Sequence, residues 1–233
     1  MSVGAILLCA GRGERLGADV PKAFVPLAGR PLFAWSLEAL QRCAEVEVIV
    51  IVGPGSVARD LLAASGASAD RIAGFTEGGA ERQHSVARGL VALPAACDVV
   101  AIHDAARALV TPGVIARAIA GARAHGAALA ATPLADTLKR VEDGRVLATP
   151  PRAGLWLAQT PQVFRRDWLE AAHAAARGAA TDDAALVEAI GHVVHVTEGD
   201  PLNFKVTTPA DLALAEHWLS SGARGAPGTG GGT

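Results

Sequence analysis

Residues 4–22 read GAILLCAGRGERLGADVPK, an apolar run that breaks into a glycine-rich, basic loop. The apolar part has the length and composition of a buried strand. Gly11 and Gly13 let the backbone approach an anion closely and turn its N–H groups toward it. Arg15 and Lys22 add positive charge that can pair with phosphate oxygens. The stretch therefore predicts a strand that opens into a polyphosphate-binding loop.

The spacing of the glycines limits the choice of ligand. The loop reads G-x-G-x-x-x-G, one residue longer than the fingerprint of dinucleotide-binding folds. That fingerprint also needs an acidic residue at the end of the second strand, where this chain has Gly53-Pro54-Gly55. The sequence contains no GxxxxGK[ST] phosphate loop either. An NAD(P)-dependent oxidoreductase is therefore disfavoured, and a plain strand-to-helix turn without a ligand stays open as an alternative.

Segments with strand and helix patterns alternate along the first 132 residues. Strands are expected at 4–9, 46–52, 71–75, 98–102 and 127–132, and helices at 31–40, 56–65, 82–91 and 112–124. This alternation predicts an α/β fold in which a mostly parallel sheet is flanked by helices on both faces. Such sheets bind ligands at the carboxyl ends of their strands.

The pattern changes after residue 132. Two short strand-like segments flank Glu142-Asp143-Gly144, which predicts a β-hairpin that protrudes as an arm at about residues 136–152. Later helices are expected at 166–177 and at 182–190 behind a Thr181 cap, and strands at 193–196 and 204–206. A capping box at Thr208-Pro209-Ala210-Asp211 is expected to open the last helix, which runs to about residue 219. We expect a single domain at 1–219, followed by a disordered glycine-rich tail at 220–233.

The composition narrows the class of protein. The 233 residues are half apolar and carry a net charge of only −2, so neither nucleic acid nor a membrane is an expected partner. No window reaches the ~18 apolar residues of a membrane helix, and the basic start of a signal peptide is missing, which predicts a cytoplasmic protein. Cys9, Cys43 and Cys97 form no CxxC pair, and Cys9 and Cys97, beside strand-like runs, are expected to be buried apolar side chains.

Polar residues at the ends of predicted elements suggest a site. His103 and Asp104 follow a buried strand, where a carboxylate facing a basic loop suits a Mg²⁺ ion that bridges phosphates. The plain alternative is a turn cap beside a core histidine. The glycine turn at 78–79 leads to Ser85, and such a turn can bond the edge of a base or simply start a helix. Lys205 lies just before a capped helix and is the most suggestive of the later polar residues.

Seven stretches stand out when the chain is taken in order. They are CAGRGERL (9–16) with Pro21-Lys22, GGAER (78–82) with Ser85-Val86, HDAAR (103–107), DTLK (136–139), QTPQ (159–162), TDDA (181–184) and NFKVT (203–207). Together they resemble the 2-C-methyl-D-erythritol 4-phosphate cytidylyltransferase family, from residue 4 to about 218. The chain departs from the family pattern at Ala23, at Ala108 and at Pro150-Pro151, the last of which affects the placement of Arg152.

The resemblance implies a Rossmann-like nucleotidyltransferase fold. It also implies a reaction in which CTP and 2-C-methyl-D-erythritol 4-phosphate are joined and pyrophosphate is released, in isoprenoid precursor synthesis. A homodimer is implied as well, in which the arm of one subunit helps to close the site of the other. Cytidylyltransferases for other sugar-alcohol phosphates, such as ribitol 5-phosphate, share most of these motifs and are the nearest alternative.

The resemblance also assigns roles to individual residues. The nucleotide and its triphosphate fall to Ala10, Gly11, Gly13, Arg15 and Lys22, the cytosine to Gly79 and Ser85, and Mg²⁺ to Asp104, which thereby also belongs to the nucleotide site. The sugar phosphate falls to Arg107, Thr137, Arg152, Thr160 and Lys205, with Thr137 and Arg152 supplied by the partner subunit.

The substrate's own phosphate is the nucleophile in such a reaction, so no protein base is needed. The task that remains is to position two polyanions and to stabilise charge at the α-phosphate. We expect Lys22, Lys205 and Mg²⁺ to carry the transition-state charge and Arg15 to act on the leaving group. A non-catalytic nucleotide-binding module is the remaining alternative, and measurable turnover would exclude it.

Overall fold

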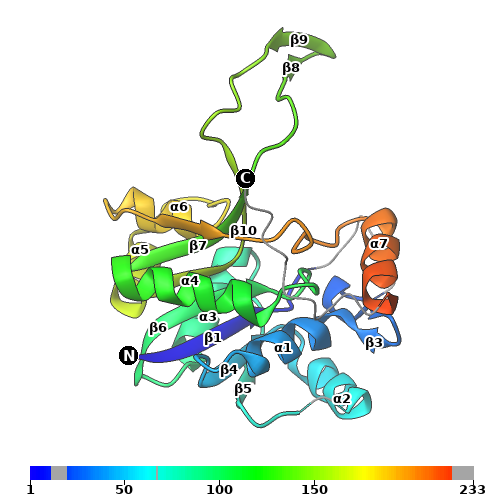
Figure 1. The fold of residues 1–233 in the computed structure, drawn as a ribbon. Helices are drawn as coiled ribbons and strands as arrows, with labels where there is room; N and C mark the ends of the chain where they lie inside the picture. Colours follow the sequence, from blue (N-terminus) through cyan, green and yellow to red (C-terminus); the bar gives the residue numbers. More distant parts are fainter. Residues whose placement is uncertain (12–19, 67, 222–233) are drawn as a thin grey trace.

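The computed structural model describes residues 1–11, 20–66 and 68–221, which build a seven-stranded sheet with helices on both faces (Figure 1). The strand order is β11-β7-β10-β6-β1-β4-β5. The strands are β1 (Ser2–Leu8), β4 (Val48–Val52), β5 (Ile72–Thr76), β6 (Cys97–Asp104), β7 (Ala127–Pro133), β10 (Trp156–Arg165) and β11 (His195–Glu198). Neighbouring strands are parallel except where β10 pairs with β6 and β7. The predicted mostly parallel sheet is confirmed.

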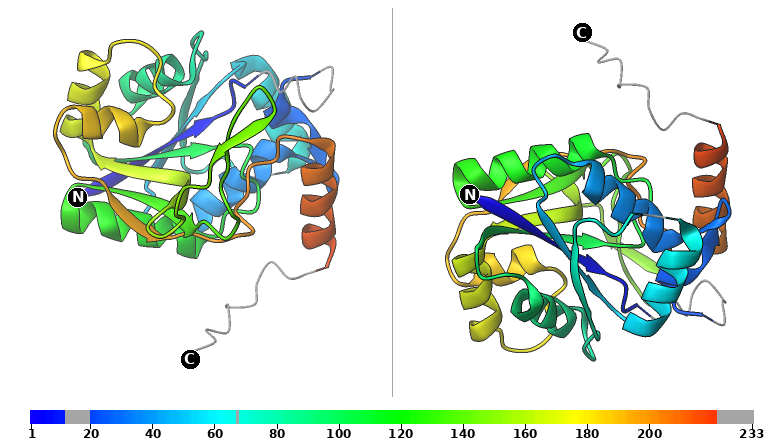
Figure 2. Two further views of the ribbon diagram at one scale, coloured as in Figure 1. Left: turned by 90° about the horizontal axis from the view of Figure 1, so that it is seen from above. Right: turned by 90° about the horizontal axis from the view of Figure 1, so that it is seen from below.

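Two layers of helices bury the sheet. The helices α1 (Leu32–Arg42), α2 (Gly55–Ser65) and α4 (Pro112–His125) share one core, and α3 (Arg82–Ala92), α5 (Arg166–Ala175) and α6 (Asp183–Ala189) share the other. Figure 2 shows α4 on one side of the sheet and α3, α5 and α6 on the other. In β1, Leu7 belongs to the first core and Ile6 to the second. Burial on both faces explains why β1 reads as an unbroken apolar run.

The last helix stands beside the sheet rather than over it. Helix α7 (Pro209–Ser220) packs near a small two-stranded sheet of β2 (Pro26–Leu27) and β3 (Arg30–Pro31), which follows the 3₁₀ helix η2 (Lys22–Phe24). A third apolar cluster joins these elements and includes Leu27, Val206 and Ala215. The capping box at the start of α7 is confirmed, since the Thr208 and Asp211 side chains bond each other's backbone N–H.

Two expectations about local structure are wrong, and one strand was missed. Strand β10 was not expected, and it lies between β6 and β7 in the middle of the sheet. Residues 204–206 do not form a strand, because this segment passes beyond the end of β6, where Val206 N bonds Ala106 O at 2.9 Å. The cap of α6 is Asp182 instead of Thr181, since the Asp182 carboxylate accepts from Ala185 N at 3.0 Å.

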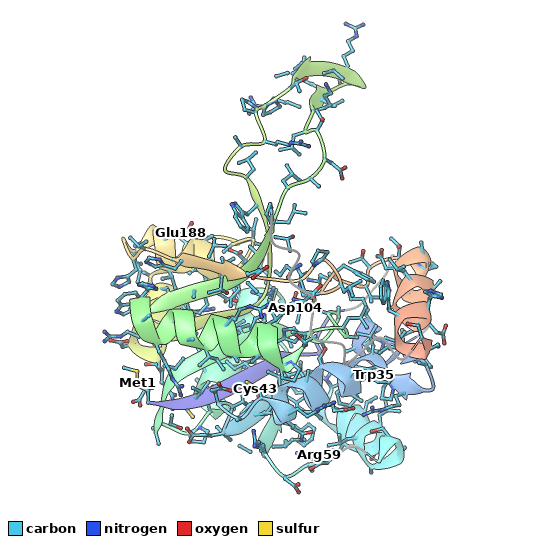
Figure 3. All side chains as sticks on the ribbon, viewed as in Figure 1. Met1, Trp35, Cys43, Arg59, Asp104 and Glu188 are labelled. Carbon is cyan, nitrogen blue, oxygen red and sulfur yellow. The ribbon has the colours of Figure 1, made fainter. Side chains whose placement is uncertain are left out.

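The expected arm is confirmed as a hairpin. Strands β8 (Arg140–Glu142) and β9 (Arg145–Ala148) are antiparallel, and the arm connects β7 to β10. Asp143 and Gly144 both have positive φ, as a two-residue hairpin turn with a right-handed twist requires. The arm extends away from the sheet, and its side chains point into open space (Figures 1 and 3).

Other expectations concern the cysteines, the membrane and the tail. Cys9 and Cys97 are buried free thiols, as expected, and Cys43 is buried and free as well. Among the described residues, none of the helices is long and apolar enough to cross a membrane. Helix α7 continues to Ser220, one residue into the predicted tail, and residues 222–233 lie outside the described part of the chain.

Candidate active site

A cavity of about 390 Å³ opens at the carboxyl ends of β1 and β6. Its walls come from the loop after β1, the glycine turn before α3, the end of β6 and the segment before α7. The lining residues are Leu8, Cys9, Ala10, Gly11, Lys22, Ala23, Gly79, Ala80, Glu81, Arg82, Ser85, Asp104, Ala106 and Lys205. The cavity therefore brings together seven of the predicted site residues: Ala10, Gly11, Lys22, Gly79, Ser85, Asp104 and Lys205. Gly13 and Arg15 lie outside the described residues.

A larger hollow of about 710 Å³ lies elsewhere, beside α1 and the end of α2. Two of its arginines are already engaged within the protein. Arg30 pairs with Glu38 at 2.6 Å, and Arg71 donates to the carbonyl oxygens of Cys43 and Val46. We therefore assign the chemistry to the smaller cavity, where the predicted residues converge.

The glycine turn before α3 allows two loops to approach closely. A Cβ atom on Gly78 would lie 2.3 Å from Ala10 Cβ, so only glycine fits there. Gly79 N donates to Ser85 Oγ at 2.9 Å, and the same hydroxyl donates to Glu81 O at 3.2 Å. The Ser85 side chain thus fixes the turn while it lines the cavity, which confirms the expected glycine turn into a helix start.

We predict that Gly78→Ala lowers kcat/KM by on the order of 10²-fold, because the new methyl group displaces the loop at Ala10 by about an ångström. The matched control is Gly113→Ala in the first turn of α4, where the added Cβ would meet side-chain atoms only at 3.6 and 3.8 Å. Steady-state kinetics of the variant beside the wild type measure the effect. Unchanged kcat/KM in Gly78→Ala would contradict the importance of this close approach.

Asp104 carries a full negative charge at the cavity wall. Its Oδ2 accepts from Lys205 Nζ at 2.6 Å, and its Oδ1 accepts from Arg82 Nε at 3.2 Å. Burial by itself would raise the pKa of Asp104, but the charges of Arg82 and then Lys205 outweigh it and hold the pKa well below its usual range. Figure 3 shows Asp104 near the middle of the molecule.

The residues beside Asp104 form a buried network. Thr160 Oγ1 accepts from Asp104 N at 3.1 Å and lies 3.1 Å from His103 Nδ1. Burial lowers the pKa of His103 to about 4, so the ring is neutral and Nδ1 accepts the Thr160 proton. The other ring nitrogen, Nε2, then donates toward Arg107 O at 3.4 Å. The Thr160 hydroxyl therefore supports the end of β6 and is not among the groups that line the cavity.

Two other predicted residues, Arg107 and Arg152, also have hydrogen-bond partners inside the chain. Arg107 donates from Nη1 to Asn203 O at 2.8 Å and from Nη2 to Ala158 O at 3.2 Å. Arg107 thus ties β10 to the segment before α7, and it does not line the cavity. Thr137 and Arg152 lie in the arm, where Arg152 Nη1 donates to Ala135 O. Neither of these two lines the cavity of its own chain.

Sequence reasoning missed Arg82, which lines the cavity and pairs with Asp104 and Asp183. Its position in GGAER, at the first residue of α3, was a signal that pointed to the cavity wall. Its two carboxylate partners could not be inferred, because they lie 22 and 101 residues further along the chain.

The residues present fit a Mg²⁺ ion that takes one carboxylate from the protein and its other ligands from substrate and water. Asp104 is an ionised carboxylate at the cavity wall, and within the described ranges no three His, Cys, Asp or Glu side chains gather closely enough to form a metal site. Mg²⁺ commonly uses one or two carboxylates together with substrate phosphates and water. The donor set therefore fits an ion that arrives with a polyphosphate.

The chain is similar to known proteins along nearly its whole length. A family model for 2-C-methyl-D-erythritol 4-phosphate cytidylyltransferase matches residues 3–221. The protein of that name from Synechococcus sp. (strain CC9902) is 44% identical over 220 residues, covering 93% of this chain and 97% of the relative. The crystal structure of the Thermus thermophilus protein of that name superposes with a TM-score of 0.77 at 37% identity, over 94% of this chain and all of that one. A 4-diphosphocytidyl-2C-methyl-D-erythritol synthase from Anaerococcus prevotii gives 0.80 at 27% identity, over 94% and 98%.

Proposed function

The chain belongs to the 2-C-methyl-D-erythritol 4-phosphate cytidylyltransferase family, and we infer that it transfers the cytidylyl group of CTP to 2-C-methyl-D-erythritol 4-phosphate. The products are 4-diphosphocytidyl-2-C-methyl-D-erythritol and pyrophosphate, in isoprenoid precursor synthesis by the non-mevalonate pathway. The observation that carries this inference is the cavity in which Lys22, Asp104 and Lys205 meet at the carboxyl ends of β1 and β6. We further propose a cytoplasmic enzyme, because three buried free thiols suit a reducing compartment.

The reaction exchanges one P–O bond for another. An oxygen of the acceptor phosphate attacks the α-phosphorus of CTP, and the bond from that phosphorus to the oxygen bridging the β-phosphate breaks. The electron pair leaves with pyrophosphate. Since the attacking phosphate is already an anion, the protein has to position the two substrates and stabilise charge rather than abstract a proton.

We propose that Lys22 and Lys205 stabilise the charge that develops around the α-phosphate, with Arg15, outside the described residues, acting on the leaving group. Lys22 and Lys205 both line the cavity, and Lys205 is held there by Asp104 at 2.6 Å. A fixed ammonium group in a partly buried site stabilises a transition-state charge far more than it would in water.

The remaining nucleotide contacts are proposed from the cavity walls. Ala10 and Gly11, together with Gly13 outside the described residues, would offer backbone N–H groups to the triphosphate. Gly79 and Ser85 would bond the edge of the cytosine. Asp104 would hold Mg²⁺, and that ion would supply charge neutralisation between phosphate oxygens when bound.

We propose that the acceptor phosphate is bound by Arg107, Thr160 and Lys205 together with Thr137 and Arg152 of a partner subunit. Arg107 and Thr160 both contact the backbone of Asp104. Arg107 N donates to Asp104 O at 2.9 Å, and Thr160 Oγ1 accepts from Asp104 N at 3.1 Å. Their present partners are carbonyl oxygens and a neutral histidine, which a doubly charged phosphate can displace as a stronger acceptor.

The exposed arm supports a homodimer. A two-stranded hairpin is marginal on its own in water, and this arm carries apolar side chains that are each about half exposed. They are Val141, Val146, Leu147, Trp156 and Leu157, which continue from the arm into the start of β10. Several large apolar side chains that are exposed on one protruding segment suggest an interaction site. A second copy of the chain, whose acceptor site the arm would complete, is the partner we propose.

A pyrophosphate-release assay with an acceptor panel tests the function. With CTP and Mg²⁺, we expect turnover with 2-C-methyl-D-erythritol 4-phosphate and a kcat/KM lower by on the order of 10²-fold or more with ribitol 5-phosphate, whose hydroxyl pattern leaves site groups unpaired. Faster turnover with ribitol 5-phosphate would support the alternative acceptor. CTP binding without turnover on any acceptor would instead identify a nucleotide-binding module.

A further inference from the structure

The stretch TDDA, residues 181–184, has no part in the transfer described above, yet it contains a fully buried carboxylate. Asp183 has no exposed surface. Its backbone N–H donates to Gln162 Oε1 at 3.1 Å, and its Oδ2 accepts from Arg82 Nη1 at 2.5 Å. Its Oδ1 lies 3.1 Å from His173 Nε2. Burying a carboxylate is costly unless it is well paired. The question is therefore why a charged residue is buried at this position and paired with Arg82.

Arg82 connects this buried carboxylate to the cavity. While Nη1 bonds Asp183, Nε donates to Asp104 Oδ1 at 3.2 Å. The other oxygen of Asp104 accepts from Lys205 Nζ at 2.6 Å. Four charges of alternating sign therefore form a row, in the order Lys205, Asp104, Arg82 and Asp183. The first three line the cavity and Asp183 lies behind it.

The Arg82 guanidinium is shared between two carboxylates, those of Asp104 and Asp183. A guanidinium is a planar fork that pairs most strongly with a single carboxylate, through two parallel N–H bonds. Here Asp183 bonds Nη1, and Asp104 bonds Nε through one oxygen. Without Asp183, Nη1 would lose its partner, and the guanidinium could turn until Nη1 and Nη2 both bond Asp104 and compete with Lys205 for its oxygens.

We propose that Asp183 is a positioning residue for cytidylyl transfer, which holds Arg82 by Nη1 and so keeps one oxygen of Asp104 for Lys205. In this way the TDDA stretch fixes the ammonium group of Lys205 at the cavity wall without touching either substrate. The inference rests on the proposed function, since the row of charges matters through the reaction that Lys205 serves.

The primary test is Asp183→Asn, which preserves the shape of the side chain and removes its charge. We expect kcat to fall about 10-fold or more while KM for CTP stays within about twofold, because the lost interaction acts on the transition state. The matched control is Asp182→Asn. The Asp182 carboxylate bonds Ala185 N and Gln162 Nε2, and asparagine caps a helix as well as aspartate does, so wild-type kcat is expected.

A double-mutant cycle separates positioning from simple stabilisation. Arg82→Lys keeps the charge but loses the fork, and we expect it to lower kcat as Asp183→Asn does. If Asp183 acts through Arg82, the double variant will be within about twofold of Arg82→Lys alone. Melting temperatures are recorded for every variant, and Arg82→Lys carries the test by itself if Asp183→Asn does not fold.

Three outcomes would overturn the proposal. They are a kcat in Asp183→Asn close to wild type, losses in the double variant that multiply, and wild-type kcat in Arg82→Lys. A wild-type protein without turnover on the acceptor panel would overturn the proposed function and this inference together. An active wild type with unaffected variants would overturn this inference alone.

Discussion

Replacing Lys22 with alanine is expected to lower kcat by about 10²- to 10³-fold while KM for CTP changes by only a few-fold. Lys22 begins η2 and lines the cavity, and its backbone N–H donates to Gly11 O at 3.3 Å, which ties it to the loop after β1. The ammonium group of Lys22 interacts most strongly when negative charge builds up around the α-phosphate in the transition state. Its loss therefore affects turnover more than binding. Steady-state and single-turnover pyrophosphate release measure the two effects separately.

Two variants control for charge alone. Lys22→Arg keeps the positive charge with a longer, planar head group and should retain more kcat than Lys22→Ala. Arg42→Ala removes a cation from the far surface, where its only ion pair, among the residues described, is a 3.7 Å contact with Glu38. Its kcat should match wild type. Near-normal kcat with a raised KM in Lys22→Ala would mean that Lys22 binds CTP without taking part in the chemistry.

The part of the fold that depends on local pattern could be predicted. The unbroken apolar run of β1 indicated a strand with both faces covered, and the sheet buries Ile6 and Leu7 on opposite sides. The Asp143-Gly144 pair indicated a tight hairpin, and both residues have the positive φ that this turn needs. In these places one stretch of sequence contains the whole physical reason for its structure.

Strand β10 could not be predicted in this way, because its polar residues are satisfied by distant partners. Gln162 is buried, and its Oε1 accepts from Asp183 N and Ala184 N at the start of α6. Gln159 likewise bonds Asp200 N and Asp200 O. Two glutamines around Pro161 have the composition of a loop until these partners are known. A polar residue in a central strand is therefore informative only after the fold is in hand.

The candidate site, like the fold, has a part that could be predicted from the sequence and a part that could not. Glycines and charges at strand ends, such as Gly11, Lys22 and Asp104, could be found because the topology of a parallel sheet brings those ends together. The inward bonds of Arg107 and Thr160, and the pairing of Arg82 with Asp183, depend on contacts between residues up to 101 positions apart. No local spacing encodes such contacts.

Mixing two inactive variants is expected to restore activity if the arm completes the partner's site. Lys22→Ala removes a group of a subunit's own cavity, and Arg152→Ala removes a group of its arm, each lowering kcat/KM by about 10²-fold or more. In a mixed dimer, one cavity keeps Lys22 and receives Arg152 from the Lys22→Ala subunit, whereas the other cavity loses both. Random re-association makes about half of the dimers mixed, so we expect about a quarter of wild-type activity.

This result depends on geometry that a single chain cannot imitate. Arg152 bonds Ala135 O at the base of an arm that extends away from the sheet, and it does not line its own cavity in the described part of the chain. If Arg152 instead served its own subunit, every site in the mixture would lack one group and activity would stay at the level of the separate variants. Val146→Asp on the exposed face of the arm supplies the control. It should abolish the rescue by preventing association, which light scattering detects as a monomer, while the Lys22 cavity and its CTP binding stay intact.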